Sequence, residues 1–131
     1  MLAAVVRQLA RRLTPIASGL HIEETHGMAQ RGGSVSARID VELREPRPLL
    51  APRVLLALER IEGARALSVL TAEDAAFISE HVLPPPGAAG RVPAIDDVAR
   101  DAEGRGIMLE IVAGAAIGEV VQAAIARGAL P

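Results

Sequence analysis

Residues 54–79 read VLLALERIEGARALSVLTAEDAAFIS, and this stretch decides the fold class. The uninterrupted apolar runs at 54–58 and 75–79 are typical of strands that are buried on both faces. Residues 61–70, between them, indicate a helix. Strands that alternate with helices predict an α/β fold of three layers, a mostly parallel sheet with helices on both faces.

The segments before this stretch extend the alternation. Residues 1–13 have helical periodicity, with arginines mostly opposite the apolar face. Residues 19–25 are consistent with a short strand. Residues 35–43 alternate apolar and polar side chains, as a half-exposed strand does. A proline-rich stretch, residues 46–52, then requires a loop.

The segments after it predict one more strand and two helices. Residues 92–95 indicate a short strand, and Asp96 is expected to cap a helix that extends to about Ala102. The last helix is predicted over residues 107–127, with Gly128 as its C-terminal stop. Two glycines within it, Gly114 and Gly118, favour close packing of this helix on the sheet.

Composition excludes several kinds of site. The length of 131 residues suits one domain over residues 1–131, and no boundary is visible. The chain has no cysteine, which excludes disulfides, thiolate zinc sites and cysteine-held iron–sulfur clusters within it. All 14 basic residues are arginine, so no lysine can form a Schiff base. The formal net charge of −2 argues against nucleic acid as a main partner.

The sequence also favours a cytoplasmic location without a membrane partner. The most apolar region, residues 107–125, contains Glu110 and Glu119, so its uncharged run is far shorter than the ~20 residues of a spanning helix. Nothing resembles a signal peptide, because Arg7, Arg11 and Arg12 interrupt the apolar N-terminal stretch.

A glycine-rich loop is the strongest candidate for a binding site. Residues 23–35 read EETHGMAQRGGSV, in which Gly27, Gly32 and Gly33 permit positive φ angles and the close approach of a partner. Backbone N–H groups beside Arg31 could form a nest for an anion, and the guanidinium adds a planar charged fork. Taken by residue type alone, a tight structural turn is the more common explanation of such glycines.

The order of residues in this loop resembles a known family. HGMAQRGGSV, residues 26–35, is similar to the hallmark loop of the gamma-type domain of 2-oxoacid:acceptor oxidoreductases, and its HGMAQ portion resembles the beta subunit of indolepyruvate ferredoxin oxidoreductase. The resemblance continues through residues 54–67, the prolines at 84–86 and VPAID at 92–96. It covers residues 16–128 approximately.

The resemblance implies an oligomeric enzyme that oxidatively decarboxylates a 2-oxoacid to an acyl-CoA and passes electrons to ferredoxin. Thiamine diphosphate, iron–sulfur clusters and coenzyme A would then bind in the complex, with the thiamine and clusters in a large partner subunit. This chain would bind no cofactor alone and would carry no catalytic residue. The resemblance implies that its loop faces the partner or an anion, through His26, Gly27, Gln30, Arg31, Gly32, Gly33 and Ser34.

Two departures from the family leave an alternative open. The family normally begins with a strand and a glycine-rich turn before its first helix, whereas this chain starts at what resembles that helix. Residues 71–74, TAED, stand where the family usually has two glycines. A non-catalytic binding or regulatory remnant of the domain is therefore the alternative. A stand-alone enzyme is less favoured, because no nucleophile–base pair is visible.

Two acidic groups are weaker candidates. Glu23 and Glu24 are adjacent in a predicted strand, so their side chains should point to opposite faces and not form a catalytic pair. A second group is more typical of a solvated, capped helix than of a metal site: Asp96, Asp97, Asp101 and Glu103.

Overall fold

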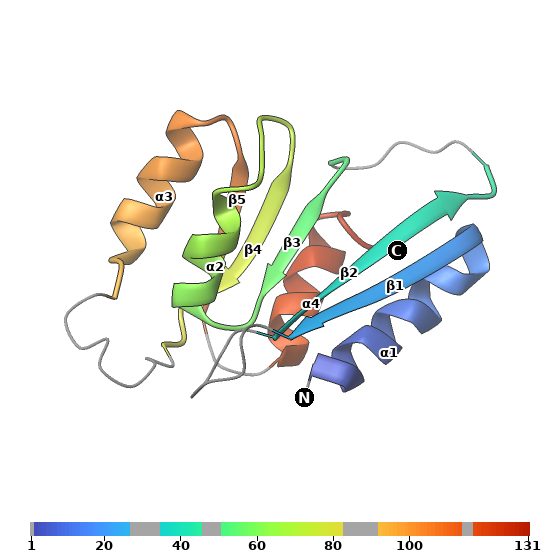
Figure 1. Cartoon of the computed structure of the whole chain (residues 1–131). Helices are drawn as coiled ribbons and strands as arrows, with labels where there is room; N and C mark the ends of the chain where they lie inside the picture. Colours follow the sequence, from blue (N-terminus) through green and yellow to red (C-terminus); the bar gives the residue numbers. More distant parts are fainter. Residues whose placement is uncertain (1, 27–34, 46–50, 83–91, 114–116) are drawn as a thin grey trace. The chain divides into compact units, whose positions relative to one another are not determined.

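The computed structural model describes residues 2–26, 35–45, 51–82, 92–113 and 117–131 (Figure 1). These residues group into two compact units, residues 1–48 with residue 131, and residues 49–130. The single domain predicted over residues 1–131 stays a prediction, because such grouping does not show whether either unit folds alone.

The second unit is built on a parallel sheet of three strands, β3 (Val54–Ala57), β4 (Ala75–Ser79) and β5 (Met108–Val112), in the order β3-β4-β5. Val54 pairs with Ala75, which pairs in turn with Met108. The five residues of β4 are all buried, as the apolar run at 75–79 predicts. The strand at 54–58 is confirmed as well, but it forms an edge of this sheet and not its interior.

Helices cover both faces of this sheet, which confirms the α/β class. Three helices follow the three strands in turn: α2 (Arg60–Leu67), α3 (Ile95–Gly104) and α4 (Ile117–Ala126). Ala76 and Ile78 of β4 pack in one core with residues of α2 and α3. The alternate residues, Ala75 and Phe77, pack in a second core with residues of α4. Apolar residues of all three strands therefore pack against helices on both faces of the sheet, which explains the apolar runs.

The first unit is a helix packed on a hairpin. Helix α1 (Leu2–Leu13) leads through a 3-10 turn into β1 (Ala17–His26), which pairs antiparallel with β2 (Val35–Leu43) (Figure 1). Helix α1 contacts both strands. The alternation predicted for β2 is confirmed, because Ile39 and Val41 are half-buried whereas Arg38 and Asp40 are exposed. Strand β1 extends beyond the predicted residues 19–25, and the two strands form their own antiparallel sheet.

The single helix predicted over residues 107–127 is wrong. Residues 108–112 form β5, and the helix α4 starts at Ile117. A short apolar run does not distinguish a strand from a buried helix, and here pairing with β4 decides for the strand. The predicted stop at Gly128 is confirmed: its φ is 81°, and the N–H groups of Gly128 and Ala129 donate to the carbonyls of Ile125 and Ala124.

Two smaller predictions near α3 are also wrong. Residues 92–94 form no strand, and Ile95 already belongs to the helix. The N-cap is Ala94, whose carbonyl accepts from the N–H groups of Asp97 and Val98, so Asp96 lies in the first turn and is not the cap. An aspartate in the first turn still stabilises the helix, because its charge opposes the positive end of the helix dipole.

The glycine that packs closely on the sheet is in α2 and not in α4. A Cβ atom on Gly63 would lie 2.6 Å from Ile78 Cγ2 and 2.9 Å from Ala57 Cβ. A Cβ atom on Gly118 would meet no described residue within 4 Å, so close packing on the sheet is not its role. Gly114 lies outside the described residues. Gly63 therefore sets how near α2 approaches β3 and β4.

Candidate functional site

The predicted binding loop connects the two strands of the hairpin. His26 is the last residue of β1 and pairs with Val35, the first residue of β2. The structure thus places both ends of the loop side by side at one end of the hairpin. Six of the predicted contact residues lie outside the described residues: Gly27, Gln30, Arg31, Gly32, Gly33 and Ser34. Their roles, and that of the His26 side chain, stay predictions.

One face of the hairpin that leads to this loop is polar. The register pairs His21 with Asp40 and Glu23 with Arg38, and these residues are exposed. Arg38 Nε lies 3.0 Å from Asp40 Oδ1 on the same face. Glu24 pairs instead with Ala37, on the opposite face from Glu23. The two adjacent glutamates therefore do not form a catalytic pair, as the sequence predicts.

The carboxyl end of the parallel sheet is a second candidate region, because α/β proteins bind ligands there. Glu59 follows β3 at this edge and caps α2: its carboxylate accepts hydrogen bonds from the N–H groups of Ile61 and Glu62, each 2.8 Å long. Helix N-termini at such edges commonly hold phosphate groups. Here the chain's own carboxylate occupies that position.

Arg60 fixes the chain at the same edge. Its Nη2 donates to the Glu80 carbonyl at 2.8 Å, its Nη1 to the Pro93 carbonyl at 3.5 Å, and its backbone N–H to the His81 carbonyl at 2.7 Å. Its Nε is buried and has no hydrogen-bond partner among the described residues. Arg60 therefore ties the start of α2 to the segments on either side of residues 83–91.

Asp74 has the one clearly shifted pKa among the described groups. Its carboxylate is 1% exposed and lies just before β4, at the amino end of the sheet. It accepts from the Thr71 N–H at 2.8 Å and lies 2.9 Å from Arg53 Nη2. The hydrogen bond from Thr71, with the bonds and charge of Arg53, lowers the pKa of Asp74 against the opposing effect of burial. This cluster joins two loops and is a structural ion pair.

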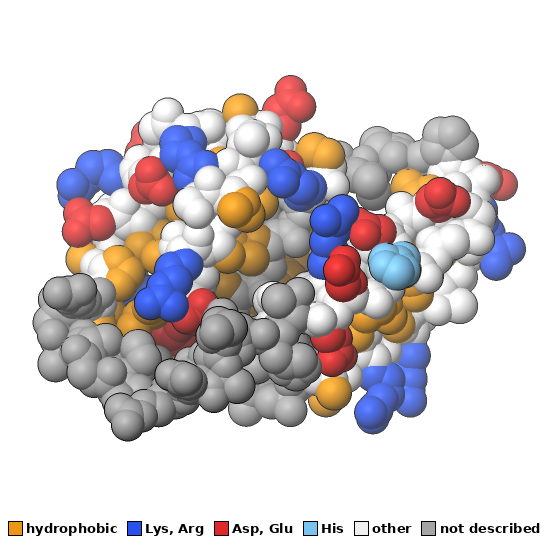
Figure 2. Space-filling view, viewed as in Figure 1, with side chains coloured by type: hydrophobic (Ala, Val, Ile, Leu, Met, Phe, Trp, Pro, Cys, Tyr) orange, Lys and Arg blue, Asp and Glu red, His pale blue; other side chains and the backbone are white. Residues whose placement is uncertain are grey.

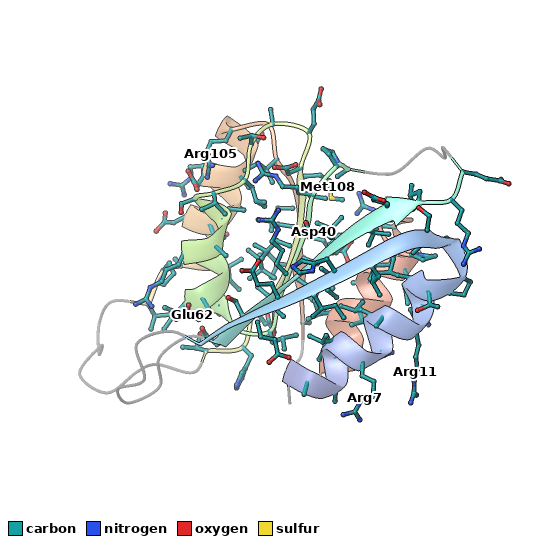
Figure 3. All side chains as sticks on the ribbon, turned by 45° about the vertical axis from the view of Figure 1, so that its right-hand side comes forward. Arg7, Arg11, Asp40, Glu62, Arg105 and Met108 are labelled. Carbon is teal, nitrogen blue, oxygen red and sulfur yellow. The ribbon has the colours of Figure 1, made fainter. Side chains whose placement is uncertain are left out.

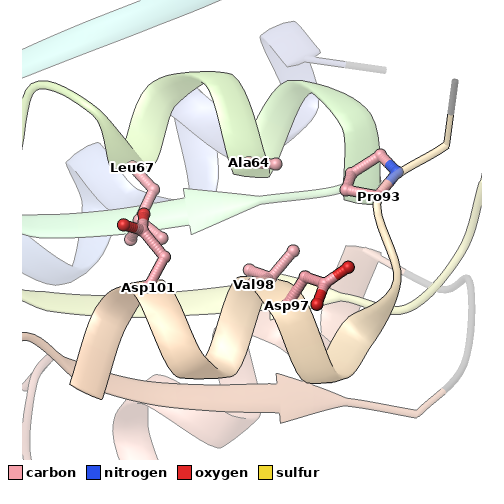
Figure 4. Close-up of a pocket in the computed structure, with 6 residues that line it drawn as sticks. All are labelled: Ala64, Leu67, Pro93, Asp97, Val98 and Asp101. Atoms are coloured by element: carbon pink, nitrogen blue, oxygen red, sulfur yellow. The ribbon is translucent and has the colours of Figure 1, made fainter. Parts of the chain in front are cut away.

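A shallow pocket lies between α2 and α3 (Figure 4). Its volume is about 180 Å³, and it is lined by Ala64, Leu67, Pro93, Asp97, Val98 and Asp101. Asp101 extends from α3 on the side that faces α2, and Asp97 lies one turn earlier on the same helix (Figure 4). Sites for small molecules usually measure about 300–1,000 Å³. The pocket is therefore small for a cofactor and better suited to one or two side chains.

Charged side chains of both signs are interspersed across the face seen in Figure 2. In the described ranges, no three histidine, aspartate or glutamate side chains come together so that they could hold a metal ion. Helices long and apolar enough to cross a bilayer are likewise not found in that part of the chain.

Sequence reasoning located the loop but missed Glu59, Arg60 and the α2–α3 pocket. Glu59 and Arg60 directly follow a buried strand, which is the signal that could have pointed to them. The side chain of Arg60 donates to the carbonyls of Glu80 and Pro93, which are 20 and 33 residues away, and no local pattern predicts such contacts.

One comparison with known proteins supports a relation to the family suggested by the loop. Over 68 residues the chain is 37% identical to indolepyruvate oxidoreductase subunit IorB from Methanothermobacter thermautotrophicus. The matched stretch covers 49% of this chain and 34% of that subunit, so the chain spans about a third of the length of this relative. No family model matches the chain. No solved structure matches it either.

Proposed function

We propose that this chain is an accessory, non-catalytic part of a 2-oxoacid:ferredoxin oxidoreductase of the indolepyruvate type. The observation that carries the proposal is the 37% identity to the IorB subunit over 68 residues. The sequence HGMAQRGGSV at 26–35 also supports it, since it resembles the hallmark loop of the gamma-type domain.

In this proposal a large partner subunit performs the chemistry. That subunit binds thiamine diphosphate and the iron–sulfur clusters, and the complex converts a 2-oxoacid and coenzyme A to an acyl-CoA while it reduces ferredoxin. The composition supports this division, because a chain without cysteine cannot hold a cluster through thiolates. The carboxylate of Glu59 at the start of α2 supports it as well, because an anionic ligand there would have to displace it.

The hairpin is the element that we expect to contact the large subunit. Its two strands are joined by the loop that contains Arg31, and their paired ends at His26 and Val35 hold the ends of this loop together. A guanidinium can bind a carboxylate or phosphate with two parallel hydrogen bonds. We therefore assign Arg31 and the glycines after it to an anionic group of the partner or of coenzyme A.

Coexpression with the thiamine-binding subunit from the same genome tests this proposal. We expect the two chains to copurify, and we expect 2-oxoacid-dependent reduction of ferredoxin to require both chains and coenzyme A. A large subunit that is fully active alone and does not bind this chain would contradict the proposal. Stable binding without any effect on turnover would instead indicate a regulatory or binding remnant.

A further inference from the structure

The pocket between α2 and α3 combines an apolar floor with an acidic rim. Ala64, Leu67 and Val98 contribute apolar side chains, whereas Asp97 and Asp101 stand at the edge (Figure 4). The two carboxylates are 66% and 55% exposed, so they are accessible to another molecule. An arginine suits such a surface, because its aliphatic stem covers apolar groups while its charged end reaches the rim.

Helix α1 carries two arginines, Arg7 and Arg11, that have no partner among the residues that the structure describes. Arg7 and Arg11 are exposed, and neither forms a hydrogen bond or an ion pair with another residue in the described part of the chain. Both side chains extend from the same side of α1 into solvent (Figure 3). The buried residues of this helix, Val5, Val6 and Leu9, lie at other positions around it.

We propose that the α2–α3 pocket binds Arg7 and Arg11 of helix α1 from a second copy of this chain. Arg7 and Arg11 are four residues apart, and so are Asp97 and Asp101. Four residues correspond to a rise of about 6 Å along a helix. Two helices that lie side by side can therefore align both charge pairs at once.

The carboxylates at the rim are available for this contact. Asp97 pairs with Arg100 and Asp101 with Arg105 within α3, and both N–O distances are 3.4 Å. Exposed pairs of this kind contribute little to stability. Arg105 in addition donates to the carbonyls of Leu67, Ser68 and Leu70, so it keeps partners when Asp101 turns to another cation.

Sedimentation of the full chain at several concentrations tests the contact. We expect weak self-association that decreases as salt is raised, because the pairs are at the surface. The variant Asp97→Asn with Asp101→Asn should weaken association about 2- to 30-fold, the range for losing two exposed ion pairs. The matched control is Asp96→Asn with Glu103→Gln, which removes the same charge from exposed positions of α3 outside the pocket.

A charge exchange provides the sharper test. A chain with Arg7→Glu and Arg11→Glu should not self-associate, nor should a chain with Asp97→Arg and Asp101→Arg, but the two should associate when mixed. Circular dichroism of each variant checks that the fold is intact. A wild-type chain that stays monomeric, or association that the pocket variant and the control reduce equally, would overturn the proposal. This test does not involve the large subunit, so its result is independent of the proposed oxidoreductase function.

Discussion

At the scale of single residues, the ionic contacts of this chain depend on arginine, which supplies all of its basic side chains. Arg53, Arg60 and Arg105 each donate to two or more oxygens of segments distant from them in sequence. The planar fork of arginine makes such bridging contacts possible, whereas lysine presents a single point charge. Arginine-to-lysine substitutions are therefore informative in this protein.

Substitution of Arg31 tests the loop. Arg31→Ala and Arg31→Lys should both weaken binding to the thiamine-containing large subunit by about 2–5 kcal/mol, or roughly thirty- to several-thousand-fold, because lysine cannot replace a bidentate fork. Folding should suffer less, since the loop is polar. Affinity measured beside thermal melts separates the two effects, and Arg65→Ala, which removes an exposed arginine of α2 outside the hairpin, is the control. Melting temperatures that fall while affinity stays constant would show that Arg31 only holds its own loop.

Asp74 predicts how stability depends on pH. The pKa of this carboxyl is lowered in the folded chain, mainly by the Thr71 N–H and then by Arg53. Its contribution is therefore complete above the unfolded pKa of about 3.9 and is lost as pH falls through the lower folded value. Asp74→Asn should reduce the free energy of unfolding by about 1–3 kcal/mol at pH 7.

Urea unfolding between pH 7 and pH 2 measures this contribution. The gap in unfolding free energy between wild type and Asp74→Asn should shrink once the pH falls below about 4. The control Asp40→Asn alters an exposed carboxylate, 49% accessible, that also pairs with an arginine, and it should change stability little at any pH. A gap that stays constant across this range would mean that Asp74 does not act through its charge.

At the scale of elements, the approach of α2 to the sheet depends on a single missing side chain. Gly63→Ala would place a methyl group 2.6 Å from Ile78 Cγ2 and 2.9 Å from Ala57 Cβ. Alanine favours a helix over glycine by about 1 kcal/mol, but overpacking a core costs about 1–3 kcal/mol. We expect the packing to decide, so Gly63→Ala should lower the melting temperature.

Gly118→Ala is the matched control, because its new methyl group would meet no described residue within 4 Å. This substitution should leave stability unchanged or raise it by up to about 1 kcal/mol. The two variants therefore make the same chemical change in two helices and should have opposite effects on the melting temperature. Equal effects would show that α2 can move away from β4 at little cost.

The elements also show what a sequence pattern can predict. Strands β2 and β4 were predictable from their patterns. The alternating run of β2 is typical of a strand with one exposed face, and the apolar run of β4 is typical of a strand buried on both faces. Strand β5 was not, since MLEIV is as compatible with a buried helix until its pairing with β4 is known. In the same way, the glycines and the arginine of residues 26–34 predicted a candidate binding loop from residue types alone. The hydrogen bonds of Arg60 were not predictable, because they join it to carbonyls distant in sequence.

At the scale of the whole molecule, the two compact units differ in how much core each contains. The second unit has two buried clusters, one on each face of its sheet. Among the described residues of the first unit, few apolar ones are buried: Val5, Val6, Leu9 and Ala17. A two-stranded hairpin is marginal in water by itself, and a short chain buries too little surface to compensate for its lost conformational entropy.

We therefore expect a fragment of residues 49–131 to fold and a fragment of residues 1–48 not to fold. The first should give a cooperative melt by circular dichroism, because its three layers bury both faces of β4. The second should show neither a cooperative melt nor protected amides, since α1 covers the hairpin with few buried side chains. Hydrogen exchange on the intact chain is the reference for both fragments. If the amides of β1 and β2 are protected in the intact chain but not in the fragment of residues 1–48, the hairpin needs contacts from outside that fragment. A cooperative melt of residues 1–48 alone would instead make the helix and hairpin an independent domain and contradict the single domain predicted over residues 1–131.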